Sequence, residues 1–388
     1  MATNYSPKIV SDSLVLCYDL YNKKKSWKGP PTTNLLNNNL SSFNDIYLRS
    51  TKTIISDNEV RFVNNGTGGT TVRLYVDNGI LVNGNTYGVS VYVKDVVGTV
   101  SFDWCDTGVS GGVNSLTSNG RLQGLGTRSD YSSTYRFLDI NISTGGSATL
   151  YNAQIDSIDM VTDYILPGTS RLNTEAIIDI SGKYTITANS LTYNSDGTFS
   201  FDGTGDASGD PTGDYISVPE SITNTSTSNY PNGCTYVFWL NVDTDADNRL
   251  ALLWGAGTFR HIEIYSSGKL FRTEAATQNG YSFGSGSFPD NVRGVWSQFA
   301  IVFANNEINR PVYWYQNGKL FYTHASMESG TDVNQYFSFS GIGRATGSPA
   351  YSYAKSFKGK IPFFNIYSRS LTTQEIKQNY NALKGRFI

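Results

Sequence analysis

Residues 357–369 read FKGKIPFFNIYSR, an apolar run of strand length with polar residues and glycine on both sides. Runs of this kind, rich in aromatic and β-branched residues, are typical of a strand buried on both faces. Further back in the chain, residues 234–243 read CTYVFWLNVD, again with apolar residues on both alternating faces. We expect these two stretches to lie in one sheet, with the second near its centre.

The residues after this strand, SLTTQEIKQNYNALKGRFI (370–388), have a different pattern and predict a helix. Thr372 or Thr373 can cap its N-terminus, Glu375 falls in the first turn, and Gly385 is expected to end it. Four apolar residues are spaced for one helical face that packs on the sheet: Leu371, Ile376, Tyr380 and Leu383.

The composition of the whole chain is typical of β-structure. The 388 residues include 38 Gly and 26 Tyr, and only 16% are charged. Such a chain favours turns and half-exposed strands over helices, and its length allows two or three domains of roughly 100–200 residues each. We predict an all-β fold with two antiparallel β-sandwich (jelly-roll) domains in series, an N-terminal arm and a short C-terminal helix.

Turn signals divide the chain into an arm at 1–33, a first jelly roll at 34–166 and a second at 167–388. In the first, TYGVSVYVKD (86–95) alternates strictly, which puts Ser90, Tyr92 and Lys94 on a wet face and the valines inside. Residues 110–133 show little pattern and are expected to form a loop. In the second, AIIDI (176–180) is expected to begin the sheet, and Asn317–Gly318 to form a hairpin turn.

The serial order of motifs in residues 171–388 resembles the laminin-G-like, concanavalin A-like jelly-roll family. The motifs are AIIDISGKYTIT, FSFDGTGD, YVFWLN, WSQFAIVF, VYWYQNGKL and finally GKIPFFNIYSRSLTTQEI. The resemblance implies two antiparallel sheets face to face, with a short helix after the last strand. Residues 34–166 resemble a jelly roll of the carbohydrate-binding-module type, through TNLLNN, YGVSVYVK and YNAQIDSIDMVTDYILP.

The arm (11–36) and the tail QNYNALKGRF (378–387) are similar to sequences of structural proteins of tailed bacteriophages. This resemblance implies a non-enzymatic virion component, such as a decoration, head-fibre, collar or tail-appendage protein. It would be exposed on the particle surface, with other virion proteins as partners, and we expect a homo-oligomer, as a trimer. The alternative is a carbohydrate-binding adhesin for host surface glycans.

Several function classes are disfavoured by the residues themselves. The net charge of -2 comes without a basic stripe, so no nucleic-acid partner is expected. The longest apolar stretches fall short of the ~20 residues that a membrane helix needs, so we expect no membrane insertion. With two His and no HExxH, GxSxG or P-loop motif, the chain is not expected to be an enzyme. A glycosidase or lyase with paired carboxylates is the third and least favoured alternative, because 32 acidic residues are present but nothing in the sequence picks out a pair. The three cysteines, Cys17, Cys105 and Cys234, are expected to be isolated, buried thiols.

Two acidic loops are candidate cation sites, although no other cofactor is expected. Asp243, Asp245 and Asp247 alternate along the chain and can wrap a hard cation such as calcium, which the resembled family sometimes binds at a sheet edge. A solvated turn between strands explains the same spacing. A second loop, which contains Asp202, Asp206, Asp210 and Asp214, is either a metal loop or a flexible insertion.

Aromatic residues of the second domain could form a platform on which sugar rings stack. Tyr313 and Tyr315 are expected to share one face of a strand. The further candidates are Trp254, Tyr351 and Tyr353. Packing in the core or on a sheet face is the competing explanation for each of them.

The arm contains SLVLCYDLYN (13–22), which alternates like a strand. It could add an edge strand to a neighbouring subunit or partner. It could equally pair with the second domain of its own chain.

Overall fold

The computed structural model divides into two compact units, one of residues 1–29 and 173–388 (unit 1) and one of residues 30–172 (unit 2). The arm and the second predicted domain thus lie in one unit. The residues that the structure describes are 8–22, 25–26, 28, 30, 32–36, 39–43, 49–75, 81–104, 109–128, 137–157, 170–194, 199–203, 213–246, 249–254, 261–265, 270–275, 281–326, 336–343 and 355–388.

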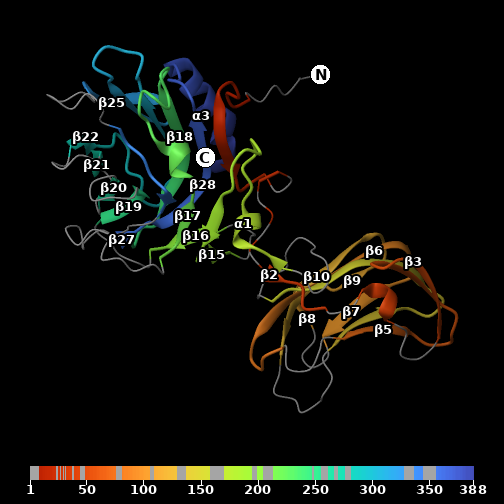
Figure 1. Ribbon diagram of the computed structural model, residues 1–388. Coiled ribbons are helices and arrows are strands. Elements are labelled where there is room, and N and C mark those ends of the chain that lie inside the picture. The colour runs from red at the N-terminus through yellow and green to blue at the C-terminus, as the bar shows by residue number, and fades with distance from the viewer. Residues whose placement is uncertain are drawn as a thin grey trace. The chain divides into compact units, whose positions relative to one another are not determined.

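Unit 2 is a sandwich of two antiparallel sheets, which Figure 1 shows as two layers. The six-stranded sheet has the order β3 (Ser50–Ser56), β4 (Glu59–Asn64), β12 (Ser147–Ile155), β6 (Thr86–Val97), β10 (Gly120–Thr127) and β8 (Val109–Val113). The four-stranded sheet has the order β5 (Thr70–Tyr75), β11 (Phe137–Ile142), β7 (Val100–Trp104) and β9 (Ser115–Leu116). Alternate residues of both sheets fill one core, Val91 and Leu150 from the first and Phe102 and Ile140 from the second. A short 3-10 helix, η1 (Leu40–Ser42), adds Leu40 to this core.

Residues 110–133, expected as a loop, contain β9, β10 and most of β8, so this prediction was wrong. The alternation in β10 is hard to see because small residues replace the usual large ones on the core side. Gly126 faces the indole of Trp104, and a Cβ at Gly126 would lie only 2.5 Å from the Trp104 ring. Because Trp104 fills the core there, the strand needs glycine and loses its hydrophobic signature.

Unit 1 is a larger sandwich, and the all-β fold with antiparallel sheets and a C-terminal helix is confirmed. Its first sheet has the order β15 (Thr192–Tyr193), β16 (Phe199–Asp202), β28 (Lys358–Tyr367), β18 (Cys234–Val242), β23 (Ser297–Phe303), β24 (Val312–Gln316) and β25 (Lys319–His324). Its second sheet has the order β14 (Thr187–Asn189), β17 (Tyr215–Ser217), β26 (Gly341–Ile342), β19 (Arg249–Trp254), β20 (His261–Tyr265), β21 (Leu270–Ala275) and β22 (Tyr281–Ser287), with β27 (Lys355–Ser356) parallel to β19.

The predicted partners β18 and β28 do pair, and β18 lies between β28 and β23. Residues of β18 are buried on both faces, as its apolar pattern indicated. The Asn317–Gly318 hairpin also forms, with φ of 52° and 76° at the two turn residues. Cys17 and Cys234 are buried free thiols, as predicted, and Cys105 lies outside the described residues.

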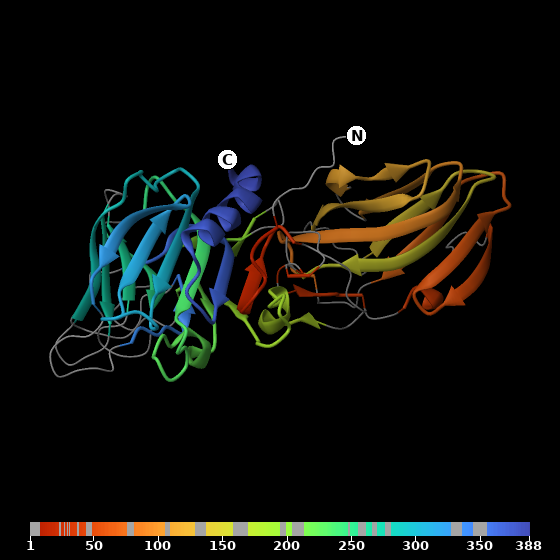
Figure 2. The ribbon, with the colours of Figure 1, turned by 90° about the horizontal axis from the view of Figure 1, so that it is seen from above.

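The arm takes the second of its two alternatives and pairs within its own chain. β1 (Leu14–Asp19) lies antiparallel to the end of β28, and Figure 2 shows it beside that strand. The segment AIIDI does not form the expected strand: α1 (Asn173–Ala176) reaches into it, and Ile178 makes an isolated bridge with Thr185. The Ile180 amide donates to the Cys17 carbonyl, so this segment supports β1 on its outer edge.

The C-terminal helix, α3 (Thr373–Phe387), packs on the outer face of the first sheet, and Thr372 is its N-cap. Thr372 and Glu375 form a capping box, which contributes about 1 kcal/mol to the helix. The helix continues through Gly385 to Phe387, so the predicted end was wrong; Phe387 stacks on Trp239 at 4.5 Å, and this packing keeps the last turn helical. No helix in the described part of the chain is long and apolar enough to cross a membrane.

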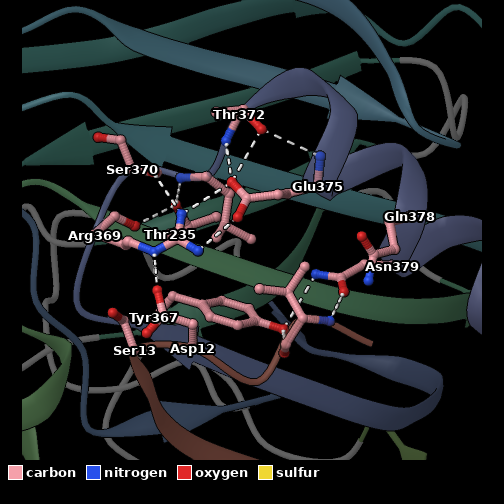
Figure 3. Close-up of polar contacts among 12 residues, drawn as sticks. Asp12, Ser13, Thr235, Tyr367, Arg369, Ser370, Thr372, Glu375, Gln378 and Asn379 are labelled. Atoms are coloured by element: carbon pink, nitrogen blue, oxygen red, sulfur yellow. Dashed lines mark hydrogen bonds and ion pairs between the residues drawn. The ribbon is translucent and has the colours of Figure 1, made fainter. Parts of the chain in front are cut away.

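Polar contacts join the arm to this helix, as Figure 3 shows. Arg369 makes a bidentate ion pair with Glu375, and its Nε donates to Asp12 of the arm at 3.0 Å. The Arg369 side chain is the main cause that lowers the pKa of Glu375 to about 2. Next to this cluster, Asn379 accepts a hydrogen bond from the Val10 amide at 2.7 Å, while the Tyr367 hydroxyl donates to the Val10 carbonyl. Residues 10–13 are thus held through their backbone and one side chain.

Candidate functional site

The outer face of the six-stranded sheet of unit 2 carries polar and aromatic side chains. Because the valines of β6 point into the core, the residues between them point outward. The strand register aligns four of these outward residues across neighbouring strands, and we call them the tyrosine row. In order, they are Glu59 on β4, Tyr151 on β12, Tyr92 on β6 and Arg121 on β10.

The two tyrosine rings at the centre of the row stack on each other. Their centroids are 5.4 Å apart and their planes make an angle of 30°. The Arg121 guanidinium lies over the Tyr92 ring at 4.8 Å, and the Lys94 ammonium over the Tyr151 ring at 5.4 Å. These cation–π contacts fix both rings while leaving all four side chains only partly buried.

Charges on this face are arranged in pairs around the rings. Lys94 donates to Glu59 at 2.6 Å, and this hydrogen bond is the main cause that raises the pKa of Lys94. Asp95 accepts from the Thr149 hydroxyl at 3.0 Å and lies 3.8 Å from Arg61. At the other end of the row, Arg121 donates to the hydroxyl of Ser90, which is fully buried beneath it.

Two β-bulges border the tyrosine row. The register of β12 against β6 shifts between Ser147 and Thr149 and again between Tyr151 and Gln154. At these shifts Asp95 and Asn152 take positive φ of 52° and 51°, which non-glycine residues adopt only at a cost. Bulges change the direction of side chains and are frequent next to functional sites. Here they delimit the stretch over which Tyr92 and Tyr151 stay in register.

The row combines the groups that bind polyhydroxylated ligands. Aromatic rings contact the apolar faces of sugars, while tyrosine hydroxyls, the Lys94 ammonium and the Arg121 guanidinium donate hydrogen bonds to sugar hydroxyls. The carboxylate of Glu59 can accept from them. Because Tyr92 and Tyr151 cover each other's facing ring surfaces, a ligand would contact the row from the solvent side.

The aromatic residues expected to form a sugar platform in the second domain are not brought together in the described residues. Tyr315 is only 5% exposed beneath α3, where its hydroxyl lies 3.0 Å from the Thr373 hydroxyl, so its ring is closed to a ligand. Tyr313 shares that face and is partly buried; its hydroxyl donates to Glu307 at 2.6 Å, and this bond raises its pKa to about 12. Trp254 ends β19, but its side chain lies outside the described residues, as do Tyr351 and Tyr353.

The candidate cation loop is partly described. Asp243 is partly buried, which raises its pKa, and Asp245 accepts from the Lys358 ammonium at 2.7 Å, which lowers its pKa. Asp247 lies outside the described residues. Among the described residues no group of three or more His, Cys, Asp or Glu side chains could hold a metal ion. Lys358 thus neutralises the carboxylate of Asp245, which was expected to bind a cation.

The second acidic loop has its two ends together. Asp214 is 1% exposed and its carboxylate accepts from the Asp202 amide at 2.8 Å. Burial is the main cause that raises the pKa of Asp214 to about 7, and the neighbouring Asp202 carboxylate adds to it. Asp202 in turn pairs with Lys358 in the sheet, so both acidic loops reach the start of β28. Asp206 and Asp210 lie outside the described residues.

The sequence pattern predicted the position of one member of the tyrosine row, Tyr92, and of its neighbour Lys94. The alternation in residues 86–95 placed Tyr92 and Lys94 on a wet face, and the structure has them there. Tyr151 and Glu59 were not singled out, because pattern alone does not tell which residues face each other across strands. Arg121 was missed because the sequence pattern predicts a loop for residues 110–133. Leu122, two glycines and the alternating polar residues are the signal for a strand there.

The two facing sheets and the terminal helix define unit 1 as a β-sandwich of the jelly-roll class. Residues 208–377 match the family model of the concanavalin A-like lectin/glucanases superfamily. The match covers less than half of the chain and confirms, for this segment, the concanavalin A-like, laminin-G-like resemblance seen in its motifs. No curated protein sequence matches the chain.

Solved structures similar to this chain share little sequence with it. A mutant of Trypanosoma rangeli sialidase with trans-sialidase activity is 14% identical, with 53% of this chain and 31% of that one covered and a TM-score of 0.35. The binding domain of botulinum neurotoxin serotype D is 16% identical over 54% and 50%, with a TM-score of 0.35. Domain 4 of the arabinanase AbnA from Geobacillus stearothermophilus, in complex with arabinotriose, is 16% identical over 52% and 91%, with a TM-score of 0.34. The chain thus spans about a third of the sialidase and half of the neurotoxin domain.

Proposed function

We propose that this protein is a non-catalytic glycan-binding protein whose ligand lies on the tyrosine row of unit 2. The observation that carries the proposal is the stacked pair Tyr92–Tyr151, held on an outward sheet face between Arg121 and Lys94. A structural role alone does not require two tyrosines and two cations on the outer side of a sheet whose core is already filled.

The two tyrosines, Glu59 and the neighbouring Lys94 each have a role in this proposal. Tyr92 and Tyr151 offer their solvent-facing ring edges and hydroxyl groups, and the surrounding contacts hold them in place before a ligand arrives, which reduces the entropy lost on binding. Glu59 and Lys94 form a paired acceptor and donor for neighbouring sugar hydroxyls. Because Lys94 already neutralises Glu59, the binding is expected to need no calcium.

A glycan array on the full chain, with and without EDTA, tests this proposal. We expect binding to a defined glycan class that persists in EDTA. Replacing both tyrosines by alanine should weaken it by about tenfold or more, since each lost aromatic contact is worth about 1 kcal/mol. The matched control is Tyr313→Ala, which removes a partly buried tyrosine of unit 1. Undiminished binding by a folded double variant would contradict the proposal.

A second candidate function rests on the arm and the tail, the segments that resemble bacteriophage structural proteins. The structure joins them, because Asp12 contacts Arg369 and Val10 contacts Asn379 of the helix. We propose that the protein is carried on the virion surface, docked to other virion proteins, as a homo-oligomer. The expected state is a trimer, which light scattering of the purified chain measures directly. A monomer at every accessible concentration would count against this assembly.

A further inference from the structure

The hairpin loop between β23 and β24 holds an isoleucine out in solvent. Ile308 is 90% exposed, although hydrogen bonds fix the loop that carries it. The Ala304 amide donates to the Pro311 carbonyl at 3.0 Å, and the Asn305 side chain donates to the Thr225 carbonyl at 2.8 Å. Ile308 is therefore a rigid apolar projection, which we call the knob.

Glu307, next to the knob in sequence, adds a negative charge. Its carboxylate accepts from the Tyr313 hydroxyl at 2.6 Å, and it makes no ion pair within the described part of the chain. The loop thus presents one large apolar side chain and one carboxylate. A surface that matches it has exposed apolar side chains with a cation beside them.

Aromatic side chains form such a surface at the other end of β23. Trp296 directly precedes this strand, and its ring lies 5.0 Å from the Phe387 ring, which Tyr21 contacts at 5.4 Å. Tyr21 is 43% exposed, Val295 is 47% exposed and Trp296 is partly exposed. We call these residues the aromatic patch: Tyr21, Val295, Trp296 and Phe387. Tryptophan and tyrosine are enriched at the energetic centres of protein interfaces.

A lysine supplies the cation beside the aromatic patch. Lys384 lies three residues before Phe387 in α3, so the two side chains are neighbours on the helix surface. Lys384 is exposed, its ammonium lies 5.8 Å from the centre of the Tyr380 ring, and no described residue forms an ion pair with it. At the same end of the helix, the acid Asp19 is already paired with Arg386 at 2.7 Å.

The knob and the aromatic patch cannot meet within one copy of the chain. They lie at opposite ends of β23, whose seven residues span about 23 Å at about 3.3 Å each. We infer that the knob of one copy docks on the aromatic patch of a second copy, with Glu307 beside Lys384. Because two different surfaces meet, the contact joins copies head to tail. The inference rests on the proposed homo-oligomer and gives it an interface; in a closed ring, such as the expected trimer, every knob and every patch is used.

Light scattering of the full chain and its variants tests the inference. Ile308→Asp removes the knob and Trp296→Ala the centre of the patch, and each should raise the dissociation constant of assembly about tenfold or more. Val295→Asp, which leaves the packing of Trp296 on Phe387 in place, should have the same effect and separates docking from folding. The control Ile54→Asp puts the same charge at an exposed isoleucine of unit 2 and should leave assembly unchanged.

Mixing two variants tests the head-to-tail contact directly. Ile308→Asp keeps an intact patch and Trp296→Ala keeps an intact knob. Each alone should be monomeric, whereas an equimolar mixture should form a one-to-one complex. Glu307→Lys and Lys384→Glu should each weaken assembly about threefold or more, and their combination in one chain should restore it.

Three results would overturn the inference. An oligomer that the knob and patch variants leave unchanged would have its interface elsewhere, and the proposed homo-oligomer would stand. Variants that dissociate the oligomer but do not combine in the mixture would indicate a contact between identical surfaces. A wild-type chain that is monomeric at every accessible concentration would refute both the interface and the homo-oligomer, but not the proposed glycan binding.

Discussion

Asp214 shows how burial changes the chemistry of a single carboxyl group. It is 1% exposed, it accepts from the Asp202 amide, and its pKa is raised to about 7, first by burial and then by the Asp202 carboxylate. Tyr193 lies near enough for Asp214 to contribute to the raised pKa of its hydroxyl, after burial. The folded protein therefore holds a proton on Asp214 at pH values where an unfolded chain has lost it.

This proton gives a pH dependence of defined sign. Between the ordinary Asp pKa near 4 and the folded value near 7, the folded state binds more protons, so raising the pH lowers the free energy of unfolding, by up to about 1.4 kcal/mol per pH unit. In Asp214→Asn this loss should disappear, so the variant gains stability over the wild type as the pH rises from 4.5 to 8. Urea denaturation of both proteins at several pH values measures the difference.

Comparing the wild type with Asp214→Asn cancels the pH-dependent contributions to the free energy of unfolding from all groups that both proteins contain. Glu375, with its pKa lowered to about 2, contributes stability above pH 4.5 that is lost as the pH falls through the region between 4.5 and 2. That contribution is the same in wild type and variant. A difference between the two proteins that stays constant from pH 4.5 to 8 would show that Asp214 is ionised in the folded state.

At the scale of the elements, the strands that the sequence predicted are those rich in large apolar residues. β6 of unit 2 follows from its alternating valines, and β18 and β28 of unit 1 follow from runs that are apolar on both faces. β10 was missed because Gly124 and Gly126 occupy its core side, where Gly126 lies against the ring of Trp104. Local pattern does not show that another residue fills the volume in front of a glycine.

The tyrosine row could be predicted only in part for a related reason. Which outward residues face each other depends on the register between strands far apart in sequence; Tyr151 and Tyr92 are brought together only when β12 pairs with β6. The bulges at Asp95 and Asn152 shift that register by one residue and have no clear sequence signature. The sequence therefore predicts that the outward face of β6 carries polar and aromatic residues. It does not predict which residues of neighbouring strands lie beside them.

At the scale of the whole molecule, unit 2 is an insertion within unit 1. Its two ends meet, because β2 (Thr32–Thr33) pairs with β13 (Ser170–Arg171). Unit 2 is continuous in sequence and has a core of its own, whereas unit 1 takes β1 from residues that precede the insertion. Leu16 and Tyr18 of β1 are fully buried in the unit 1 core, and the Cys17 amide donates to Asp179.

This arrangement predicts different behaviour for the two halves of the chain. The fragment 30–172 should fold cooperatively and bind glycans as tightly as the full chain, because the tyrosine row lies wholly within it.

The fragment 173–388 lacks β1, which leaves one edge of β28 and part of the core uncovered. It should therefore melt at a lower temperature than unit 1 does in the full chain, by several degrees or more, since two buried side chains contribute about 1.5–3 kcal/mol each. Differential scanning calorimetry of the full chain and both fragments measures this. A fragment 30–172 that is unfolded, or one that is folded and has lost the glycan affinity of the full chain, would show that the binding surface needs more than the insertion.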